Sequence, residues 1–414
     1  MIEYGLIGSN VANSFSKLIH EGYANINYEL VSLNDENKVK DFLKAPFKGI
    51  NVTIPYKKVA FELCDVVSEE AKSTNVVNTI VKREGKTYGF NTDIYGFEKL
   101  LEKNNIVIKN KKCLILGTGS TSRTVTYVLN RNKCKSIIYL SRTPNNINVF
   151  AYSDIENYKD AEIIINTTPV GMNDEESLLD FSIFTNAQYF VDVIYNKAHT
   201  KMAINALENN IKTVNGLYML IAQAHKSQEL FFNKPIDERI IEKAYLKLFF
   251  NMFNLTFIGH PLSGKTELAK ELSRALDVKT IDIDQEIEKR EQRTISAIFK
   301  ENGENYFRKI ESSLLKEVSG FKGYIISLGG GAVLNKENME LILKNSLVVS
   351  LKRNISDIKD NEFINRPLCT CKSQLLELIS VRALLYKKYS DLEIENDSFE
   401  KSIKKIGEIL WNSM

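Results

Sequence analysis

The segment LTFIGHPLSGKT, residues 255–266, decides the fold of the second half of the chain. An apolar run predicts a strand, a helical pattern follows, and the residues between them match G-x4-G-K-[ST] from Gly259 through Gly264 to Thr266. In that setting, backbone N–H groups and the helix N-terminus form a cradle for phosphate. Lys265 is expected to reach the β- and γ-phosphates of a nucleotide, and Thr266 to hold Mg²⁺.

Similar strand-like and helical patterns alternate along the whole chain, which predicts α/β architecture. Runs that are apolar on both faces suit strands of a parallel sheet that helices cover. The predicted strands are 4–7, 49–53, 113–116, 137–140, 163–166, 255–258, 324–328 and 347–351.

The bulk properties narrow the classes of function. A chain of 414 residues favours two or three domains, and a net charge of +3 gives no electrostatic reason to expect nucleic acid or membrane partners. The five cysteines are scattered and predict free thiols, with no further ligand near Cys369 and Cys371 to suggest a metal. We find no leader peptide and no apolar stretch of about 20 residues, so we expect a cytoplasmic protein.

Further motifs follow the phosphate loop. Asp282 and Asp284 end the next apolar run, where one carboxylate can reach the metal and the other a substrate hydroxyl. Arg308 and Glu311 are spaced to form an ion pair on one helix face, which is the alternative to a role in binding. Then come three glycines after a strand, an Asn-Arg-Pro-Leu run and an Arg-x3-Tyr run, at 329–331, 365–368 and 382–386.

In this order and spacing, residues 253 to about 409 resemble shikimate kinase, a P-loop family of the nucleoside-monophosphate-kinase type. The resemblance implies that ATP and Mg²⁺ are bound and that Arg366, from a lid, stabilises the transferring phosphoryl group. It also implies that Asp284 orients the attacking hydroxyl and that Asp282 lies near Mg²⁺. The implied shikimate-binding residues are Asp284, Arg308, Gly330, Gly331 and Arg382. The lid segment, about 354–380, is shorter than usual in the family and lacks its second arginine.

The first half contains an incomplete match to a dinucleotide-binding motif. Gly117-Thr-Gly119-Ser120 follows an apolar strand and precedes a helical run, although the third glycine of G-x-G-x-x-G is missing. The next strand ends in Ser141-Arg142-Thr143, about 20 residues further on, where an NAD site would carry an acidic residue. Because an arginine suits the 2′-phosphate, the sequence favours NADP(H).

The motifs on either side of this region resemble shikimate dehydrogenase over essentially all of residues 1–250. The most specific are N-V-T-I-P-x-K at 51–57 and N-T-D-x-x-G at 91–96. The resemblance implies that Lys57 and Asp93 are the catalytic pair. It implies that substrate is held by Ser14, Ser16, Thr53, Asn78, Tyr195 and Gln223, and that the cofactor is bound by Gly117, Gly119, Ser120, Ser141, Arg142, Thr143 and Gly216.

This pair suits carbonyl reduction. Hydride transfer to a ketone leaves an alkoxide that must gain a proton, and a lysine beside an aspartate can donate one while its charge stays balanced. The chain departs from the family at Asn13, Lys17, Ser120-Thr121 and Lys197. None of these departures removes a catalytic group, but they bear on cofactor affinity and on the mouth of the substrate site.

The two resemblances together predict a bifunctional enzyme. The first half would reduce 3-dehydroshikimate to shikimate with NADPH, and the second would phosphorylate shikimate with ATP and Mg²⁺. The expected domains are a substrate subdomain at 1–103 completed by 215–250, a Rossmann-like NADP subdomain at 104–214, and the kinase domain at 253–414. Two alternatives stay open: one half serves only as a binding or scaffold module, or the first half is an NAD-preferring quinate/shikimate relative. The oligomeric state is not predicted.

Overall fold

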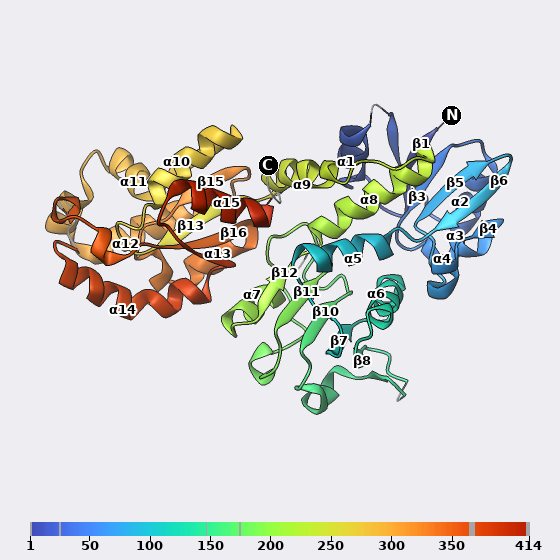
Figure 1. Ribbon diagram of the computed structural model, residues 1–414, viewed down its shortest axis with the longest axis horizontal. Helices are drawn as coiled ribbons and strands as arrows, with labels where there is room; N and C mark the ends of the chain where they lie inside the picture. Colours follow the sequence, from blue (N-terminus) through green and yellow to red (C-terminus); the bar gives the residue numbers. More distant parts are fainter. Residues whose placement is uncertain (1, 25, 146, 174, 364–368, 411–414) are drawn as a thin grey trace. The chain divides into compact units, whose positions relative to one another are not determined.

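The computed structural model describes residues 2–24, 26–145, 147–173, 175–363 and 369–410 (Figure 1). Contacts group the chain into two compact units. Unit 1 comprises Met1–Pro169, Ile183–Tyr195 and Val214–Leu246, and unit 2 comprises Val170–Ser182, Asn196–Thr213 and Lys247–Met414. This grouping places two short segments of the range 104–214 with the phosphate-loop unit. The domain boundaries expected from the sequence stay a prediction.

The first sheet of unit 1 has the strand order β2-β1-β3-β5-β6-β4. Its strands are β1 (Tyr4–Gly8), β2 (Tyr28–Ser32), β3 (Gly49–Val52), β4 (Val66–Val67), β5 (Thr79–Arg83) and β6 (Lys86–Phe90). β1 pairs in parallel with β2 and β3, whereas β5 and β6 form an antiparallel hairpin. The helices in this stretch are α1 (Ser16–Tyr23), α2 (Glu36–Lys44), α3 (Lys57–Leu63), α4 (Glu69–Thr74) and α5 (Asp93–Lys103).

The second sheet has the order β12-β11-β10-β7-β8-β9, as in a dinucleotide-binding fold. Its strands are β7 (Lys112–Leu116), β8 (Ser136–Leu140), β9 (Val149–Phe150), β10 (Ile163–Asn166), β11 (Tyr189–Asp192) and β12 (Lys212–Val214). α6 (Ser120–Arg131) follows β7. The long α8 (Leu217–Phe232) returns to the first sheet and packs against α5, and α9 (Arg239–Met252) follows it.

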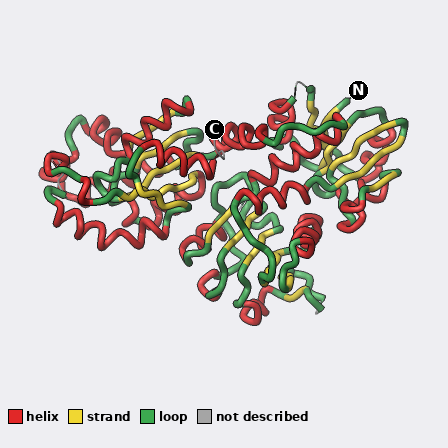
Figure 2. The backbone as a smooth tube through the Cα atoms, in the orientation of Figure 1, coloured by secondary structure: helices red, strands yellow, loops and turns green. Residues whose placement is uncertain are grey.

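Unit 2 contains a parallel sheet of order β14-β15-β13-β16-β17. Its strands are β13 (Asn254–Gly259), β14 (Lys279–Asp282), β15 (Tyr324–Ser327), β16 (Ser346–Lys352) and β17 (Leu392–Glu395). The helices are α10 (Lys265–Leu276), α11 (Ile283–Glu291), α12 (Ile295–Val318), α13 (Lys336–Asn345), α14 (Lys372–Lys388) and α15 (Phe399–Leu410). Figure 2 shows the strands of this unit enclosed by helices. All eight predicted strands are present and the α/β class is confirmed.

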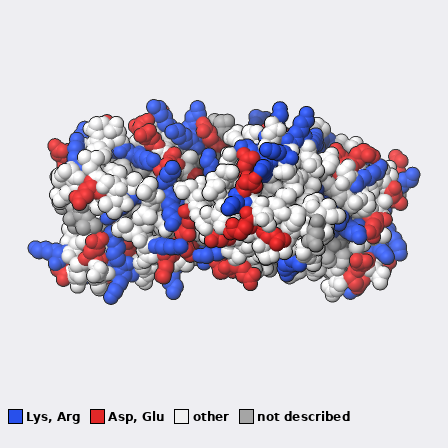
Figure 3. Space-filling view, turned by 90° about the horizontal axis from the view of Figure 1, so that it is seen from below, with Lys and Arg blue, Asp and Glu red and all other residues white. Residues whose placement is uncertain are grey.

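The surface agrees with the modest net charge. Figure 3 shows basic and acidic side chains interspersed over the described residues of the face in view. Among the described helices, none combines the length and the apolar character that crossing a bilayer requires.

The segment 196–213 belongs to unit 2 through both apolar and polar contacts. Its helix α7 (Lys201–Glu208) adds Ile204 and Leu207 to the apolar core beneath α12 and α13. The buried His199 bonds through Nδ1 to the Leu343 carbonyl and through Nε2 to Asp391 Oδ1, both at 2.8 Å. Burial opposes a charge on this ring, but the Asp391 carboxylate outweighs it, and the pKa of His199 is raised.

We predict that this histidine makes the stability of unit 2 depend on pH. A raised folded-state pKa means that the contribution is complete below the ordinary value of about 6.5 and is lost as the pH rises through the folded pKa. His199→Ala should lower the free energy of unfolding of this unit by about 3 kcal/mol near pH 6. The loss should shrink clearly near pH 9. Urea unfolding of both proteins at the two pH values measures it, and an equal loss at both would contradict the assignment.

Candidate active sites

Lys57 and Asp93 meet in unit 1. Lys57 begins α3 and Asp93 begins α5, and Lys57 Nζ donates a hydrogen bond to Asp93 Oδ2 at 2.6 Å. The two side chains are only 12% and 10% exposed. The first turn of α5 also favours a carboxylate, since its amide groups leave partial positive charge there. The predicted catalytic pair therefore exists as a close, largely dehydrated ion pair.

Asn78 holds the aspartate from the other side. Its Nδ2 donates to Asp93 Oδ1 at 2.9 Å, while its Oδ1 accepts from the Thr92 backbone N–H at 2.8 Å. Each carboxylate oxygen of Asp93 thus has its own donor, so the aspartate is fixed in orientation relative to Lys57.

A buried polar network supports this arrangement. Asn51 Nδ2 donates to Thr79 Oγ1 at 3.0 Å and to Ser227 Oγ at 2.9 Å, and its Oδ1 accepts from the Tyr28 hydroxyl at 2.7 Å. Thr92 lies within 3.1 Å of both Thr79 and Ser227. The sequence motifs contain Asn51 and Thr92, and Thr79 follows the predicted residue Asn78. Tyr28 and Ser227 lie outside every motif and were not predicted.

The predicted substrate residues come from several elements of unit 1. Ser14 and Ser16 lie at the start of α1 with their hydroxyl oxygens 3.1 Å apart. Gln223 on α8 accepts from the Thr92 hydroxyl at 3.4 Å and so reaches the network around Asn78.

Thr53 and Tyr195 complete this set. Thr53 follows β3, and its N–H donates to the Ile7 carbonyl at 2.9 Å. The Tyr195 ring stands edge-on to Phe15, with 6.4 Å between ring centroids, which brings the end of the second sheet to the start of α1. Their roles in binding stay predictions.

The dinucleotide loop has the backbone that the motif requires. Gly117 has φ +95°, a conformation that other residues rarely adopt, and a β-carbon there would stand 2.9 Å from Thr168 Cγ2. Gly119 caps α6 and Ser120 begins it, and the first turn of that helix carries no acidic side chain. Gly216 is equally constrained, because a β-carbon would lie 2.1 Å from the Val193 carbonyl oxygen. The N-terminus of α6 suits a pyrophosphate.

The turn after β8 presents a cationic side chain. The Ser141 hydroxyl accepts from the Thr143 N–H at 3.2 Å, which shapes the turn, and Arg142 between them is exposed. An exposed guanidinium at this position can meet an anionic group on a ribose.

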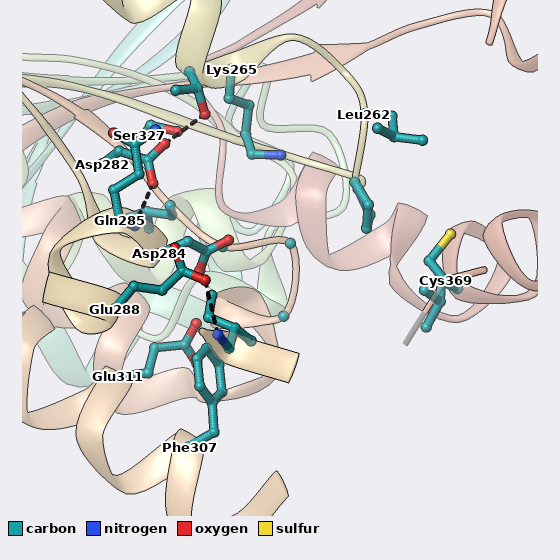
Figure 4. Close-up of a pocket in the computed structure, with 18 of the residues that line it drawn as sticks. Leu262, Lys265, Asp282, Asp284, Gln285, Glu288, Phe307, Glu311, Ser327 and Cys369 are labelled. Atoms are coloured by element: carbon teal, nitrogen blue, oxygen red, sulfur yellow. Dashed lines mark hydrogen bonds between the residues drawn. The ribbon is translucent and has the colours of Figure 1, made fainter. Parts of the chain in front are cut away.

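The second site is a cavity of about 390 Å³ at the carboxyl ends of the unit 2 strands (Figure 4). Lys265 lies across the phosphate loop, and its buried ammonium group donates to the Gly259 and His260 carbonyl oxygens at 3.0 and 2.9 Å. Gly264, at φ +86°, caps α10. The predicted residues that line the cavity are Gly264, Lys265, Thr266, Asp282, Asp284, Arg308, Gly330, Gly331 and Arg382.

A hydroxyl oxygen and a carboxylate oxygen, both possible ligands of a metal ion, lie together beside the phosphate loop. The Thr266 hydroxyl donates to Asp282 Oδ2 at 2.5 Å, while Asp282 Oδ1 caps α11 by accepting from the Gln285 N–H at 3.0 Å. Asp284 lies in the first turn of α11 and reaches the other part of the cavity, where its Oδ1 is 2.7 Å from a β-carbon built on Gly329.

The arginines lie around the glycine turn. Arg308 Nη1 donates to Glu311 Oε2 at 2.7 Å, so the ion pair expected as the alternative is present, and both residues also line the cavity. Arg382 Nη1 donates to the Gly330 carbonyl at 3.2 Å. A β-carbon on Gly331 would stand 2.2 Å from Arg308 Nη2, so glycine is required for the guanidinium to lie there.

Glu311 is a cavity residue for which the motifs predicted no role beyond the ion pair. It is 1% exposed, and its Oε1 has no hydrogen-bond partner among the described residues. Burial raises the pKa of this carboxyl although Arg308 opposes the shift. Arg366, the predicted lid arginine, lies outside the described residues.

Comparisons with known proteins relate each half of the chain to a family. Residues 6–80 match the family model of the shikimate dehydrogenase substrate binding domain, and residues 261–410 match that of shikimate kinase. The NADP(+) shikimate dehydrogenase of Clostridium perfringens strain 13 is 35% identical over 264 residues, and the match covers 59% of this chain and 97% of that protein.

Two solved structures match a similar fraction of this chain. A chorismate mutase/shikimate 5-dehydrogenase fusion protein from Clostridium acetobutylicum has a TM-score of 0.57 at 35% identity, covering 61% of this chain and 98% of that one. Shikimate 5-dehydrogenase from Thermus thermophilus, in complex with NADP(H) and shikimate, has a TM-score of 0.53 at 27% identity, covering 59% and 98%.

The buried network predicts a stability effect at Asn51. Asn51→Ala would leave the Tyr28 hydroxyl without its acceptor and would remove one donor each from Thr79 and Ser227, in a region closed to water. We expect a loss of about 2–3 kcal/mol in the free energy of unfolding of unit 1, measured by urea denaturation. The matched control is Asn104→Ala, which removes one bond at the end of α5 and should cost about 1 kcal/mol. Equal losses in the two variants would contradict the importance of the network.

Proposed function

Because the chain belongs to the shikimate dehydrogenase family and carries a shikimate kinase domain at residues 261–410, we propose that it catalyses two consecutive reactions. Unit 1 reduces 3-dehydroshikimate to shikimate with NADPH. Unit 2 transfers a phosphoryl group from ATP to a hydroxyl of shikimate. One observation carries this proposal. The same chain contains the hydrogen-bonded side chains of Lys57, Asp93 and Asn78 in unit 1 and a phosphate-loop cavity lined by polar side chains in unit 2.

In the first reaction, bound NADPH supplies a hydride to the carbonyl carbon of the substrate. Lys57 gives a proton to the carbonyl oxygen, which becomes the new hydroxyl. Asp93 balances the ammonium charge and holds the lysine, and Asn78 fixes the aspartate. Because the pair is largely dehydrated, its electrostatic effect on the developing alkoxide is stronger than it would be in water.

The residues present fit NADP(H). The α6 N-terminus and the glycine turn at Gly117 and Gly119 fit a pyrophosphate, and Arg142 offers a guanidinium for the 2′-phosphate. This fit, with an arginine at the position where an NAD site would carry an acidic residue, disfavours the alternative of an NAD-preferring enzyme.

In the second reaction, the phosphate loop holds the nucleotide and the cavity holds shikimate. Arg308 and Arg382 offer two guanidinium groups to the substrate carboxylate, a pairing that can be bidentate. Asp284 accepts from the attacking hydroxyl and orients it. Lys265 changes its bonds from the loop carbonyls to phosphate oxygens, and its charge offsets the charge of the transferring group.

The residues also fit Mg²⁺. Thr266 and Asp282 bring a hydroxyl and a carboxylate oxygen together beside the loop. Mg²⁺ prefers such oxygen ligands, usually one or two from protein together with phosphates and water. When bound, the ion neutralises phosphate charge.

Variants of the two lysines should separate the reactions. Lys57→Ala should lower the rate of NADPH oxidation with 3-dehydroshikimate by a factor on the order of 10²–10⁴, because the proton donor is lost. Lys265→Ala should lower the rate of ADP formation with shikimate by a factor on the order of 10²–10³. Each variant should keep the other activity, and an unchanged circular dichroism spectrum serves as the folding control for the altered unit. A wild-type chain inactive in one assay would favour the alternative in which that half is a binding module.

The cofactor preference tests Arg142 separately. Arg142→Gln should raise the KM for NADPH by about tenfold or more, since a charge-assisted bond to the 2′-phosphate is worth about 1.5–3 kcal/mol. The KM for NADH should change little. A parallel loss with both cofactors would show that Arg142 acts on the fold of the turn and not on the phosphate.

A further inference from the structure

Leu262 has an unusual backbone within the phosphate loop. Its φ is +67°, in the left-handed region that residues with bulky side chains rarely adopt. The conformation therefore needs support from contacts that the leucine makes elsewhere.

The side chain of Leu262 provides one such contact. It packs against an apolar cluster whose buried members are Ile358, Phe363, Cys369 and Leu375, with Ile355, Leu378 and Ile379 partly buried around them. We call these seven residues the 355–379 cluster. Leu262, Cys369 and Leu378 also form part of the cavity wall. In Figure 4, Leu262 and Cys369 lie on the side of the cavity away from Asp284 and Glu311.

The backbone of the same residue is held by Arg353. The Arg353 Nη1 donates to the Leu262 carbonyl at 3.3 Å and to Glu362 Oε2 at 2.8 Å, and its Nη2 donates to the Asp357 carbonyl at 3.1 Å. The Arg353 N–H also donates to His260 Nε2 at 3.1 Å, so the loop is attached at two residues. One guanidinium thus joins the phosphate loop to the segment that builds the cluster.

We propose that Leu262 is a positioning residue, which keeps the phosphate loop in its nucleotide-binding shape by anchoring it to the 355–379 cluster. This rests on the proposed kinase function of the same site. Phosphate affinity depends on backbone N–H groups that converge before the ligand arrives, and an anchored loop loses less conformational freedom on binding. The anchor therefore sets nucleotide affinity without touching the transferred group.

The test measures MgADP binding to the full chain by titration calorimetry. Leu262→Ala and Leu262→Gly both remove the apolar contact with the cluster, while the Arg353 bond to the carbonyl of residue 262 stays, and they should weaken binding by about tenfold. Leu262→Met keeps the volume and the apolar contact, and it should bind within about twofold of the wild type. Leu384→Ala is the matched control, because Leu384 lies on α14 beside this region but is 79% exposed.

The glycine variant separates anchoring from strain. Glycine adopts a positive φ freely, so if the side chain only imposes strain, Leu262→Gly should bind MgADP as tightly as the wild type or more tightly, and the proposal would be overturned. In kinase assays, loss of the anchor in a Leu262 variant should raise the KM for ATP and leave kcat nearly unchanged. General destabilisation of the unit predicts neither of these two results. An unchanged circular dichroism spectrum shows that each variant is folded, because NADPH oxidation reports only on unit 1. A wild type that binds MgADP but leaves shikimate unmodified would contradict the proposed kinase function. It would not contradict the role of Leu262 in nucleotide binding.

Discussion

A buried strand that turns into a helix leaves the first amide groups of that helix without partners inside it, and this constraint shapes both units. β3 leads to α3 and Lys57, and β6 leads to α5 and Asp93. β7 leads to α6, and β13 leads to α10 and Lys265. Each of these turns places partial positive charge and a polar side chain at a sheet edge. The proposed hydride-transfer site and the proposed phosphoryl-transfer site are therefore two uses of the same structural element.

The two sites differ in how they hold their charges. In unit 1, Lys57 and Asn78 hold Asp93 through hydrogen bonds, and the hydroxyl and amide groups of the neighbouring network form hydrogen bonds with one another. Such a network keeps a reactive pair in one geometry because every buried group has a partner. In unit 2 the buried Glu311 balances Arg308 but keeps one oxygen without a partner among the described residues. Arg308 and Glu311 both line the cavity of that unit.

The sequence predicted the strands and most of these side chains, because apolar runs and glycine-containing turns are local signals. The match at 255–266 is an example, since strand, loop and helix are contiguous. Ser227 could not be predicted, because it reaches Asn51 across 176 positions and belongs to no motif. The burial of His199 and the positive φ of Leu262 are likewise tertiary effects: the first depends on Asp391 and the second on the 355–379 cluster. The roles of the site residues and the domain boundaries stay predictions.

The most direct test of the two-reaction account is one incubation of the wild-type chain with 3-dehydroshikimate, NADPH, ATP and Mg²⁺, with the products read by mass spectrometry. The account predicts a shikimate phosphate, formed with consumption of both NADPH and ATP. Accumulation of shikimate without phosphate would contradict the assignment of unit 2. Unchanged 3-dehydroshikimate, from a protein that phosphorylates added shikimate, would contradict the assignment of unit 1.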